Sequence, residues 1–309
     1  MLNISKSTLI LVVLGLIAPY VLYPVFVMKI LCFGLFAMAF NLLLGYVGLL
    51  SFGHAAFLGT GGYVTGYLVM ETGLSPELGI LFGTIAAGLL GAVFGKLAVK
   101  REGIYFAMVT LALAQLAFFF FLQAPFTGGE DGMQGIPRGT LFGFIDLNDS
   151  LNMYYTVLAV FLFGFWLIKR TIHSPFGQVL KAIRENEPRA LSLGYNVNDY
   201  KWVAFIISAS LAGLAGSTKT LVFQLASLTD AHWHMSGEVV LMTLLGGMGT
   251  LFGPLVGAAS VVTIQNYLSG GELGNYIHII MGVIFVVCVL AFRSGIVGEF
   301  QKFMKKNFN

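Results

Sequence analysis

The chain has 309 residues, of which 57% are hydrophobic and only 10% are charged, with 17 Lys and Arg against 14 Asp and Glu. A soluble domain needs more polar surface than this to cover its core, so the composition excludes a water-soluble protein. The net charge of +3 is small, and no basic run is interleaved with aromatic residues, which excludes nucleic acid as a partner.

Long segments without a charged residue follow one another along the chain. They cover residues 7–28, 30–70, 78–95, 103–129, 150–168, 202–218, 239–271 and 273–292. Most approach or exceed the roughly 20 residues that a helix needs to cross about 30 Å of hydrocarbon. The first is longer than a signal-peptide core and has no cleavage site, so we interpret it as a span. Cys32 and Cys288 lie inside such segments and are expected to pack there, forming neither a disulfide nor a zinc site.

The charges between these segments alternate in sign, and this alternation predicts the topology. The basic loops are 96–102, 169–201 and the tail, and the acidic loops are 71–77, 124–150 and 270–276. Short basic loops stay on the cytoplasmic side of a membrane. The pattern therefore predicts an all-α integral membrane protein, a polytopic helical bundle of about ten crossings with both termini cytoplasmic. It forms a single transmembrane domain over residues 1–309.

Two of the apolar segments are expected to turn back within themselves. The segment 30–70 begins and ends on the outer side, and its turn is predicted at 45–53, where glycines break the helix. The segment 237–269 turns at 246–254, and the part before this turn, about ten residues, is too short for a full span. Irregular backbone at membrane depth is tolerated only where protein buries it or where it lines a cavity. Gly-rich broken or re-entrant helices in both halves therefore indicate a translocation site.

The candidate pathway residues are neutral and lie at or near these two breaks. They are Asn41, Ser51, Phe52, His54, Gly246, Gly247 and Gly249. Two other interpretations stay open. Glycines also permit close helix packing, and the alternative for His54 is a hydrogen-bonded structural role.

The sequence lacks the residues that several kinds of chemistry require. The nearest approach to a nucleotide-binding loop, Gly91 to Leu97, has the wrong spacing and ends in Leu where Ser or Thr would hold magnesium. No mid-span carboxylate suggests a proton- or sodium-coupled carrier. No catalytic cluster can be assembled, and His232 and His234 lack further metal ligands. We therefore expect no enzyme activity, no catalytic residue, no metal and no cofactor in this chain.

The loop at 171–200 is the one long basic loop, and it is predicted to form two short helices. Apolar residues recur at helical spacing over 177–184, Pro188 suits the first turn of a second helix, and Gly194 would stop it. The charged residues Arg184, Glu185, Glu187 and Arg189 surround the joint. A solvent-exposed charge cluster is the simplest interpretation of these residues. However, a permease that binds no nucleotide itself needs a surface on which a partner can exert force.

Four motifs in order resemble the membrane subunits of branched-chain amino-acid ABC importers, the LivM-type permeases. They are Asn41 to Phe57, Thr127 to Pro137, the 171–200 loop continuing to Gly216, and Gly246 to Pro254. The resemblance covers roughly residues 40–290 and places the chain in the superfamily that also holds ribose permeases.

This resemblance implies a permease of the bacterial cytoplasmic (inner) membrane that translocates Leu, Ile or Val. The implied partners are a second homologous permease, in a heterodimer rather than a homodimer, two ATPase subunits that carry ATP and Mg, and a periplasmic or extracellular solute-binding protein. The implied coupling residues are Arg184, Glu185, Glu187, Pro188, Arg189 and Gly194. The loop 124–150 would lie outside, with Gly128, Gly129, Asp131 and Gly132 exposed to the binding protein.

Two alternatives remain at the level of function. An ABC permease for another small neutral solute, such as urea or a short amide, would share the same loop pattern, since no residue specifies the solute. A stand-alone channel or secondary carrier is more remote, because it would need no coupling surface.

Overall fold

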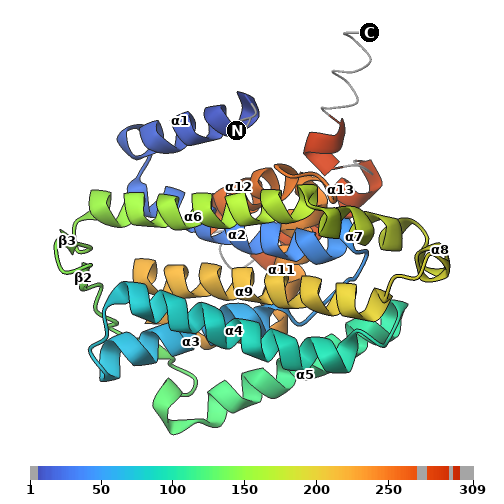
Figure 1. Ribbon diagram of the computed structural model, residues 1–309. Coiled ribbons are helices and arrows are strands. Elements are labelled where there is room, and N and C mark those ends of the chain that lie inside the picture. The colour runs from blue at the N-terminus through green and yellow to red at the C-terminus, as the bar shows by residue number, and fades with distance from the viewer. Residues whose placement is uncertain (1–5, 270–276, 292–294, 300–309) are drawn as a thin grey trace.

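The computed structural model describes residues 6–269, 277–291 and 295–299, and these residues are mostly helical (Figure 1). The helices are α1 (Lys6–Val21), α2 (Pro24–Tyr46), α3 (His54–Glu71), α4 (Pro76–Ala98), α5 (Gly103–Gln123), η1 (Pro125–Thr127), α6 (Ser150–His173), α7 (Pro175–Glu185), α8 (Glu187–Ser192), α9 (Val197–Phe223), α10 (Leu228–Ala231), α11 (Trp233–Gly246), α12 (Gly253–Ser269) and α13 (Ile277–Ala291). The predicted outer loop 270–276, the tail beyond 299 and the side chain of Cys288 lie outside the described residues.

Both predicted helix breaks are present. The segment 30–70 is interrupted between Tyr46 and His54, and the segment 237–269 is interrupted between Gly246 and Gly253. Glycines hold the backbone in the left-handed region at each break, with φ of 86° at Gly48 and 77° at Gly249. A side chain is strained in this region, which is why the turns occur at glycine.

The first apolar segment differs from its prediction. We expected one span over 7–28, but α1 ends at Val21 and α2 begins at Pro24. The residue before a proline avoids the helical region, and Tyr23 accordingly has the extended values φ −61° and ψ 122°. Because α1 has only 16 residues, it is shorter than a full crossing, and Lys29 lies inside α2 rather than at a loop.

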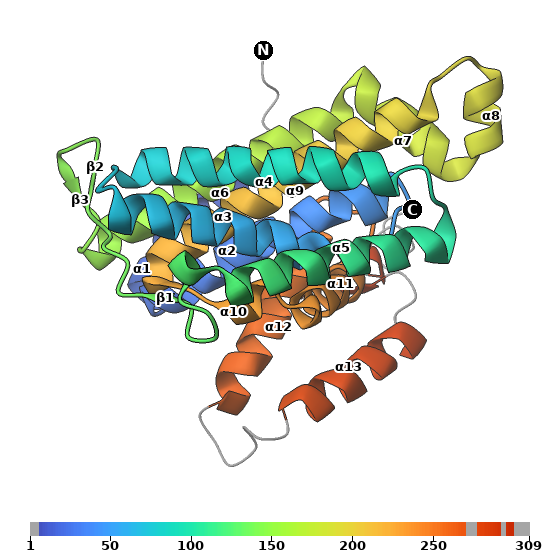
Figure 2. The same cartoon turned by 90° about the horizontal axis from the view of Figure 1, so that it is seen from below.

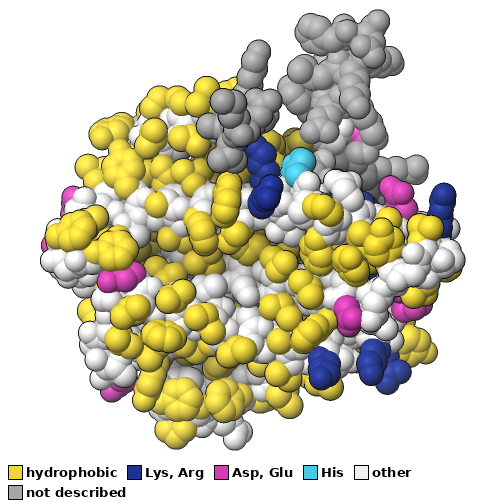
Figure 3. Space-filling model, in the orientation of Figure 1, with side chains coloured by type: hydrophobic (Ala, Val, Ile, Leu, Met, Phe, Trp, Pro, Cys, Tyr) yellow, Lys and Arg dark blue, Asp and Glu magenta, His cyan; other side chains and the backbone are white. Residues whose placement is uncertain are grey.

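Five of the described helices are long and apolar enough to cross a membrane, namely α2, α4, α5, α6 and α9. Figure 3 shows one face of the molecule covered with hydrophobic side chains, with charged side chains mainly toward its periphery. This distribution suits a molecule whose sides contact lipid. The prediction of about ten crossings with cytoplasmic termini stays a prediction.

Helix α2 forms the centre of the bundle, and its side chains are buried on every side, with Phe36 and Phe40 at 0% exposure. Helices α6, α9, α11 and α12 pack around it (Figure 1). Glycines bring α3 and α9 into close contact, since a Cβ at Gly61 would lie 2.2 Å from the carbonyl oxygen of Gly213. This agrees with the packing interpretation of the helix glycines.

The two ends of the bundle differ in structure. One end, here called the loop end, carries the residues 72–75 and 124–149, with the short strands β1 (Met133–Gln134), β2 (Thr140–Leu141) and β3 (Ile145–Asp146). Strand β1 pairs antiparallel with β4 (Leu225–Ala226), and β2 pairs with β3. Helices α7 and α8 lie at the opposite end, here called the α7–α8 end (Figures 1 and 2).

Candidate functional site

The two glycine-rich breaks meet in the structure where Gly45 lies against Gly249, and Asn41 of α2 binds the second break. The side-chain amide of Asn41 donates a hydrogen bond to the carbonyl oxygen of Thr250 at 2.9 Å, and its Oδ1 accepts one from the backbone N–H of Gly249, also at 2.9 Å. Asn41 is buried, with 3% exposure. The residue therefore supplies partners for irregular backbone that no helix ladder can satisfy.

Helix α7 reaches the same place through Arg184. Its Nη1 donates a hydrogen bond to the carbonyl oxygen of Gly45, in the last turn of α2. A Cβ added to Gly249 would lie 3.1 Å from Nη1 of Arg184, so the guanidinium lies against both breaks. A displacement of α7 would therefore be transmitted directly to the two glycine-rich segments. Below we call Asn41, Arg184 and the breaks at 45–53 and 246–253 the break junction.

The second break is a tight helical hairpin between α11 and α12. A Cβ at Gly246 would lie 1.8 Å from the carbonyl oxygen of Gly253, and one at Gly257 would lie 1.8 Å from that of Met242. Gly247 has a φ of 122°, which side chains rarely adopt. Helix α11 has only 14 residues, which is about 21 Å of rise and shorter than the bilayer core. These features agree with the expected re-entrant geometry.

His54 begins α3 and lies in the packed interior with 0% exposure. Its Nε2 is 2.8 Å from Oγ of Ser208, and that hydroxyl donates to the carbonyl oxygen of Ala39. Because the hydroxyl proton is already used, Nε2 carries the ring proton and donates to Ser208. The rings of Phe40 and Phe57 contact the imidazole edge to face. His54 thus links α2, α3 and α9, as the structural interpretation expects.

The remaining predicted pathway residues, Ser51 and Phe52, also make local backbone contacts. Oγ of Ser51 accepts a hydrogen bond from the N–H of Gly53 at 3.1 Å, and the N–H of Phe52 donates to Oγ1 of Thr110 at 3.1 Å. The first of these bonds stabilises the turn itself, and the second ties the first break to α5. Ser51 is fully buried and Phe52 is partly buried.

The two short helices predicted in the 171–200 loop are present as α7 and α8. Ser174 caps α7 by accepting from the N–H of Gly177, and Asn186 caps α8 by accepting from the N–H of Arg189 at 3.0 Å. Pro188 lies in the first turn of α8, and Gly194, with a φ of 87°, follows its end. Glu185 and Arg189 are exposed.

Sequence reasoning did not identify the partner of Glu187. The carboxylate forms an ion pair with Lys201 of α9, whose Nζ lies 2.6 Å from Oε1 and 2.7 Å from Oε2. The Lys201 side chain is only 4% exposed and that of Glu187 is 29% exposed, so the ammonium is shielded from water while the carboxylate is partly accessible. It fastens α8 to the first turns of α9.

At the loop end of the bundle, the loop 124–149 is fastened to the last turn of α9 and the residue that follows it. The guanidinium of Arg138 donates to the carbonyl oxygen of Val222 at 2.7 Å, and the N–H of Ile136 donates to that of Gln224 at 3.2 Å. In the predicted external motif, the backbone φ is positive at Gly128, Gly129 and Gly132. Gly128 and Asp131 are exposed, whereas Gly132 is buried against the backbone of Ala226.

A second ion pair, Lys219 of α9 with Asp230 of α10, was not anticipated either. Nζ of Lys219 also lies over the ring of Phe33, 5.4 Å from its centroid. Lys219 follows a charge-free segment, and Asp230 is the next charged residue along the chain. The sequence signal for this ion pair was therefore two successive charges of opposite sign after a charge-free segment. Among the described residues, no group of three or more His, Cys, Asp or Glu side chains could hold a metal ion.

Residues 25–289 match the family described as the permease component of branched-chain amino acid transport systems. The high-affinity branched-chain amino acid transport system permease protein LivM of Escherichia coli (strain K12) is 26% identical over 273 residues, which cover 81% of this chain and 64% of that protein. The chain thus spans less than two thirds of the length of this relative.

Sugar permeases are similar as well. The ribose import permease protein RbsC of Bacillus subtilis (strain 168) is 27% identical over 269 residues, which cover 80% of this chain and 81% of that protein. The L-arabinose ABC transporter permease protein AraH of Azospirillum brasilense is 28% identical over 266 residues, covering 82% and 74% of the two chains. No solved structure shows a significant match.

Proposed function

The chain belongs to the family of permease components of branched-chain amino acid transport systems, and from this premise we propose that it is the membrane-spanning permease subunit of an ABC importer. It would reside in the bacterial cytoplasmic membrane with the α7–α8 end in the cytoplasm, since that end carries the basic loops. Leu, Ile and Val are the proposed solutes, because LivM-named proteins are among the relatives that match over most of this chain.

A second candidate solute class is supported by the relatives named for ribose and arabinose. The residues of the two breaks, 45–53 and 246–253, are themselves uncharged, and the guanidinium of Arg184 lies against them. Uncharged walls suit a neutral or zwitterionic solute of either class. Urea and short amides belong to the same neutral class. The link between α7 and the breaks is common to all these alternatives, so the coupling proposal does not depend on the solute.

The proposal for coupling is carried by one observation, the contact of Arg184 with Gly45. Leu191 of α8 and Leu193, which follows the end of this helix, are 55% and 68% exposed on the side of the molecule where an ATPase subunit would dock. Apolar side chains exposed outside the membrane are typical of a protein interface. Movement imposed on α8 would pass to α9 through the Glu187–Lys201 pair and to the break junction through Arg184.

In the proposed cycle two partner ATPase subunits bind ATP with Mg and close, and this chain converts the closure into a change of its pathway. Helices α7 and α8 move together with α6 and α9, which they connect, and the break junction shifts so that the pathway opens toward the loop end. A solute-binding protein would dock on the loop 124–150. A second homologous permease, in a heterodimer, would complete the pathway.

Reconstitution of the assembled importer in proteoliposomes tests this proposal. Arg184→Ala and Glu187→Ala, alone and combined, are expected to retain ATP hydrolysis while solute uptake falls, because the mechanical link is lost. Arg170→Ala, an exposed basic residue at the end of α6, is the matched control and should leave both unchanged. Uptake at the wild-type level in the double variant would falsify the coupling role.

The same preparation identifies the solute class. Competition of labelled leucine uptake by Ile, Val, ribose, arabinose and urea distinguishes the candidates. Displacement by Ile and Val alone supports branched-chain amino acids, whereas uptake of a sugar or urea selects the second candidate. Transport by the purified chain without ATPase subunits would instead identify a stand-alone carrier.

A further inference from the structure

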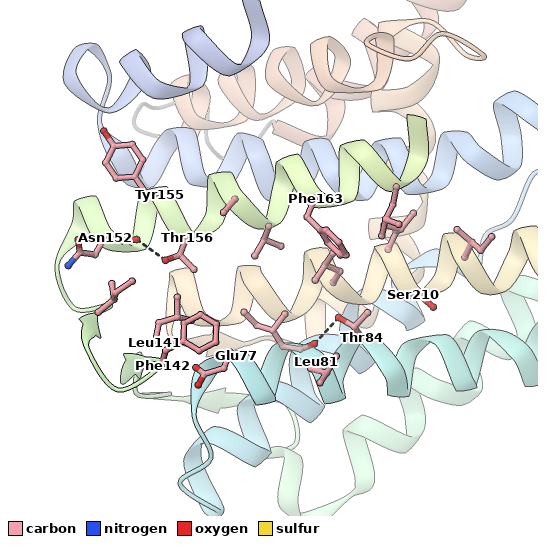
Figure 4. Close-up of a pocket in the computed structure, with 18 of the residues that line it drawn as sticks. Glu77, Leu81, Thr84, Leu141, Phe142, Asn152, Tyr155, Thr156, Phe163 and Ser210 are labelled. Atoms are coloured by element: carbon pink, nitrogen blue, oxygen red, sulfur yellow. Dashed lines mark hydrogen bonds between the residues drawn. The ribbon is translucent and has the colours of Figure 1, made fainter. Parts of the chain in front are cut away.

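A long groove lies outside the break junction, between α4, α6 and α9, and the β2–β3 hairpin closes it at the loop end (Figure 4). Its volume is about 960 Å³. Helices α6 and α9 both pack against α2 and approach each other little, and the groove between them is lined by residues 152–171 of α6 and 206–214 of α9. The groove faces the hydrophobic side of the molecule seen in Figure 3.

The groove runs through nearly the whole thickness of a bilayer. On α6 its lining residues extend from Asn152 to Thr171, which corresponds to about 28 Å at 1.5 Å of rise per residue. The hydrocarbon core of a bilayer is about 30 Å thick. A molecule that fills the groove therefore lies parallel to the lipid chains.

The serine and threonine hydroxyl groups along the walls are already hydrogen-bonded within their own helices. Thr84 donates to the carbonyl oxygen of Ile80 at 2.7 Å, Ser210 donates to that of Ile206 at 2.9 Å, and Thr171 donates to that of Leu167 at 2.9 Å. The walls thus offer methyl and methylene groups rather than free donors. A sugar or an amino acid would lose its water without finding replacement partners, but a hydrocarbon chain would not.

The loop end of the groove has a different character, because Glu77 lies there in the first turn of α4 (Figure 4). Its Oε2 is buried and has no hydrogen-bond partner among the described residues. None of the described residues that line the groove is Lys, Arg or His. A buried carboxylate oxygen without a partner is costly, so this end favours a ligand that brings a cationic donor.

From the apolar walls, the length of the groove and the unpartnered oxygen of Glu77, we propose that the groove binds a phospholipid with a primary-ammonium headgroup. An acyl chain lies between α6 and α9, and the ammonium donates to Glu77. A primary ammonium has three N–H donors, whereas a quaternary one has none, and an anionic headgroup would be repelled by the carboxylate. This site depends only on the membrane location of the chain.

Native mass spectrometry of the delipidated full-length chain tests the proposal with three lipids of identical acyl chains, namely phosphatidylethanolamine, phosphatidylcholine and phosphatidylglycerol. Phosphatidylethanolamine is expected to bind about tenfold more tightly than the other two, the scale of one charge-assisted hydrogen bond. Glu77→Gln should abolish this preference. The matched control is Glu71→Gln, an exposed carboxylate at the same end, which should preserve it.

A second variant tests the position of the acyl chain. Ala159 lines the groove from α6 and is exposed, so Ala159→Trp fills the groove without disturbing the core. This variant should lose the binding of all three lipids. Circular dichroism confirms that each variant is folded, and the thermal midpoint of the wild type, but not of Ala159→Trp, should rise when phosphatidylethanolamine is added.

Three results would overturn the proposal. The first is equal affinity of the wild type for the three headgroups, and the second is undiminished lipid binding by Ala159→Trp. The third is displacement of the bound lipid by leucine or ribose, which would make the groove a solute site. Glycerophosphoethanolamine, which has the headgroup but no acyl chain, should not displace the lipid.

Discussion

Asn41 holds the backbone of Gly249, 208 positions further along the chain, with its side-chain oxygen, while its amide holds the neighbouring Thr250. A single buried side chain thereby joins α2, the helix that forms the centre of the bundle, to the turn between α11 and α12. Arg184 of α7 binds beside Asn41, where its guanidinium donates a hydrogen bond to the carbonyl oxygen of Gly45. Asn41, which connects α2 to the α11–α12 turn, and Arg184, which is proposed to couple α7 to the breaks, thus lie at the same junction.

Removing the Asn41 amide is expected to destabilise this junction. Asn41→Ala leaves the partly buried N–H of Gly249 and carbonyl of Thr250 without this partner, at a cost of about 1–3 kcal/mol. Unfolding of the purified chain in a denaturing-detergent titration measures the loss. The control is Asn198→Ala, an exposed residue at the start of α9, which should change the free energy of unfolding little. Equal stability of both variants would contradict the assigned role of Asn41.

A methyl group at the hairpin turn should also destabilise the fold. In Gly246→Ala the new Cβ would lie 1.8 Å from the carbonyl oxygen of Gly253, so α11 and α12 must separate. We expect a cost of about 1–3 kcal/mol, typical of overpacking. Gly237→Ala on the same helix meets nothing within 4 Å and should be neutral or slightly stabilising. Thermal unfolding of the two variants side by side tests the difference, and a tolerated alanine at 246 would refute the close approach.

The Glu187–Lys201 pair should show strong energetic coupling. Glu187→Ala leaves the buried ammonium of Lys201 unpaired, whereas the double change with Lys201→Met removes both charges. We therefore expect the double variant to be more stable than the sum of the single losses predicts, by about 1–3 kcal/mol. Glu185→Ala, which removes an exposed carboxylate from the preceding helix, serves as the control. Additive losses at 187 and 201 would mean that the pair contributes nothing.

The stability of the chain should depend on pH through His232, between α10 and α11. Burial, and then the neighbouring His234, lower the pKa of His232 below its ordinary value of 6.5. The unfolded chain therefore binds the proton more readily, so the contribution to stability is present above about pH 6.5 and is lost as pH falls below it. The Nδ1 atoms of the two rings lie 2.8 Å apart, which allows only one of them to carry a proton there.

Thermal unfolding between about pH 7.5 and pH 5 measures this dependence. His232→Asn keeps a side chain that can cap α11 but does not titrate, so its stability should fall less over the same interval. A variant as sensitive to pH as the wild type would show that another group is responsible.

Much of the architecture could be predicted because it depends on local composition. Charge-free segments indicated the helices, glycine density located both breaks, and the Pro and Gly positions around α8 predicted its ends. The single error of this kind was the prediction of one span across 7–28. Pro24 forces Tyr23 out of the helix, but neither residue is charged, so the charge pattern did not show the break.

The composition of the sequence by itself determined that this chain is a helical membrane protein whose two halves each contain an interrupted helix, because a bilayer accepts charge only at its surfaces and accepts broken backbone only inside protein. Only the tertiary structure decided that the two interruptions touch, that Asn41 binds the second and Arg184 lies against both, and that Glu187 pairs with Lys201. Such contacts depend on how helices distant in the chain pack against one another, since hydrogen bonds and ion pairs act over a few ångströms and leave no local pattern.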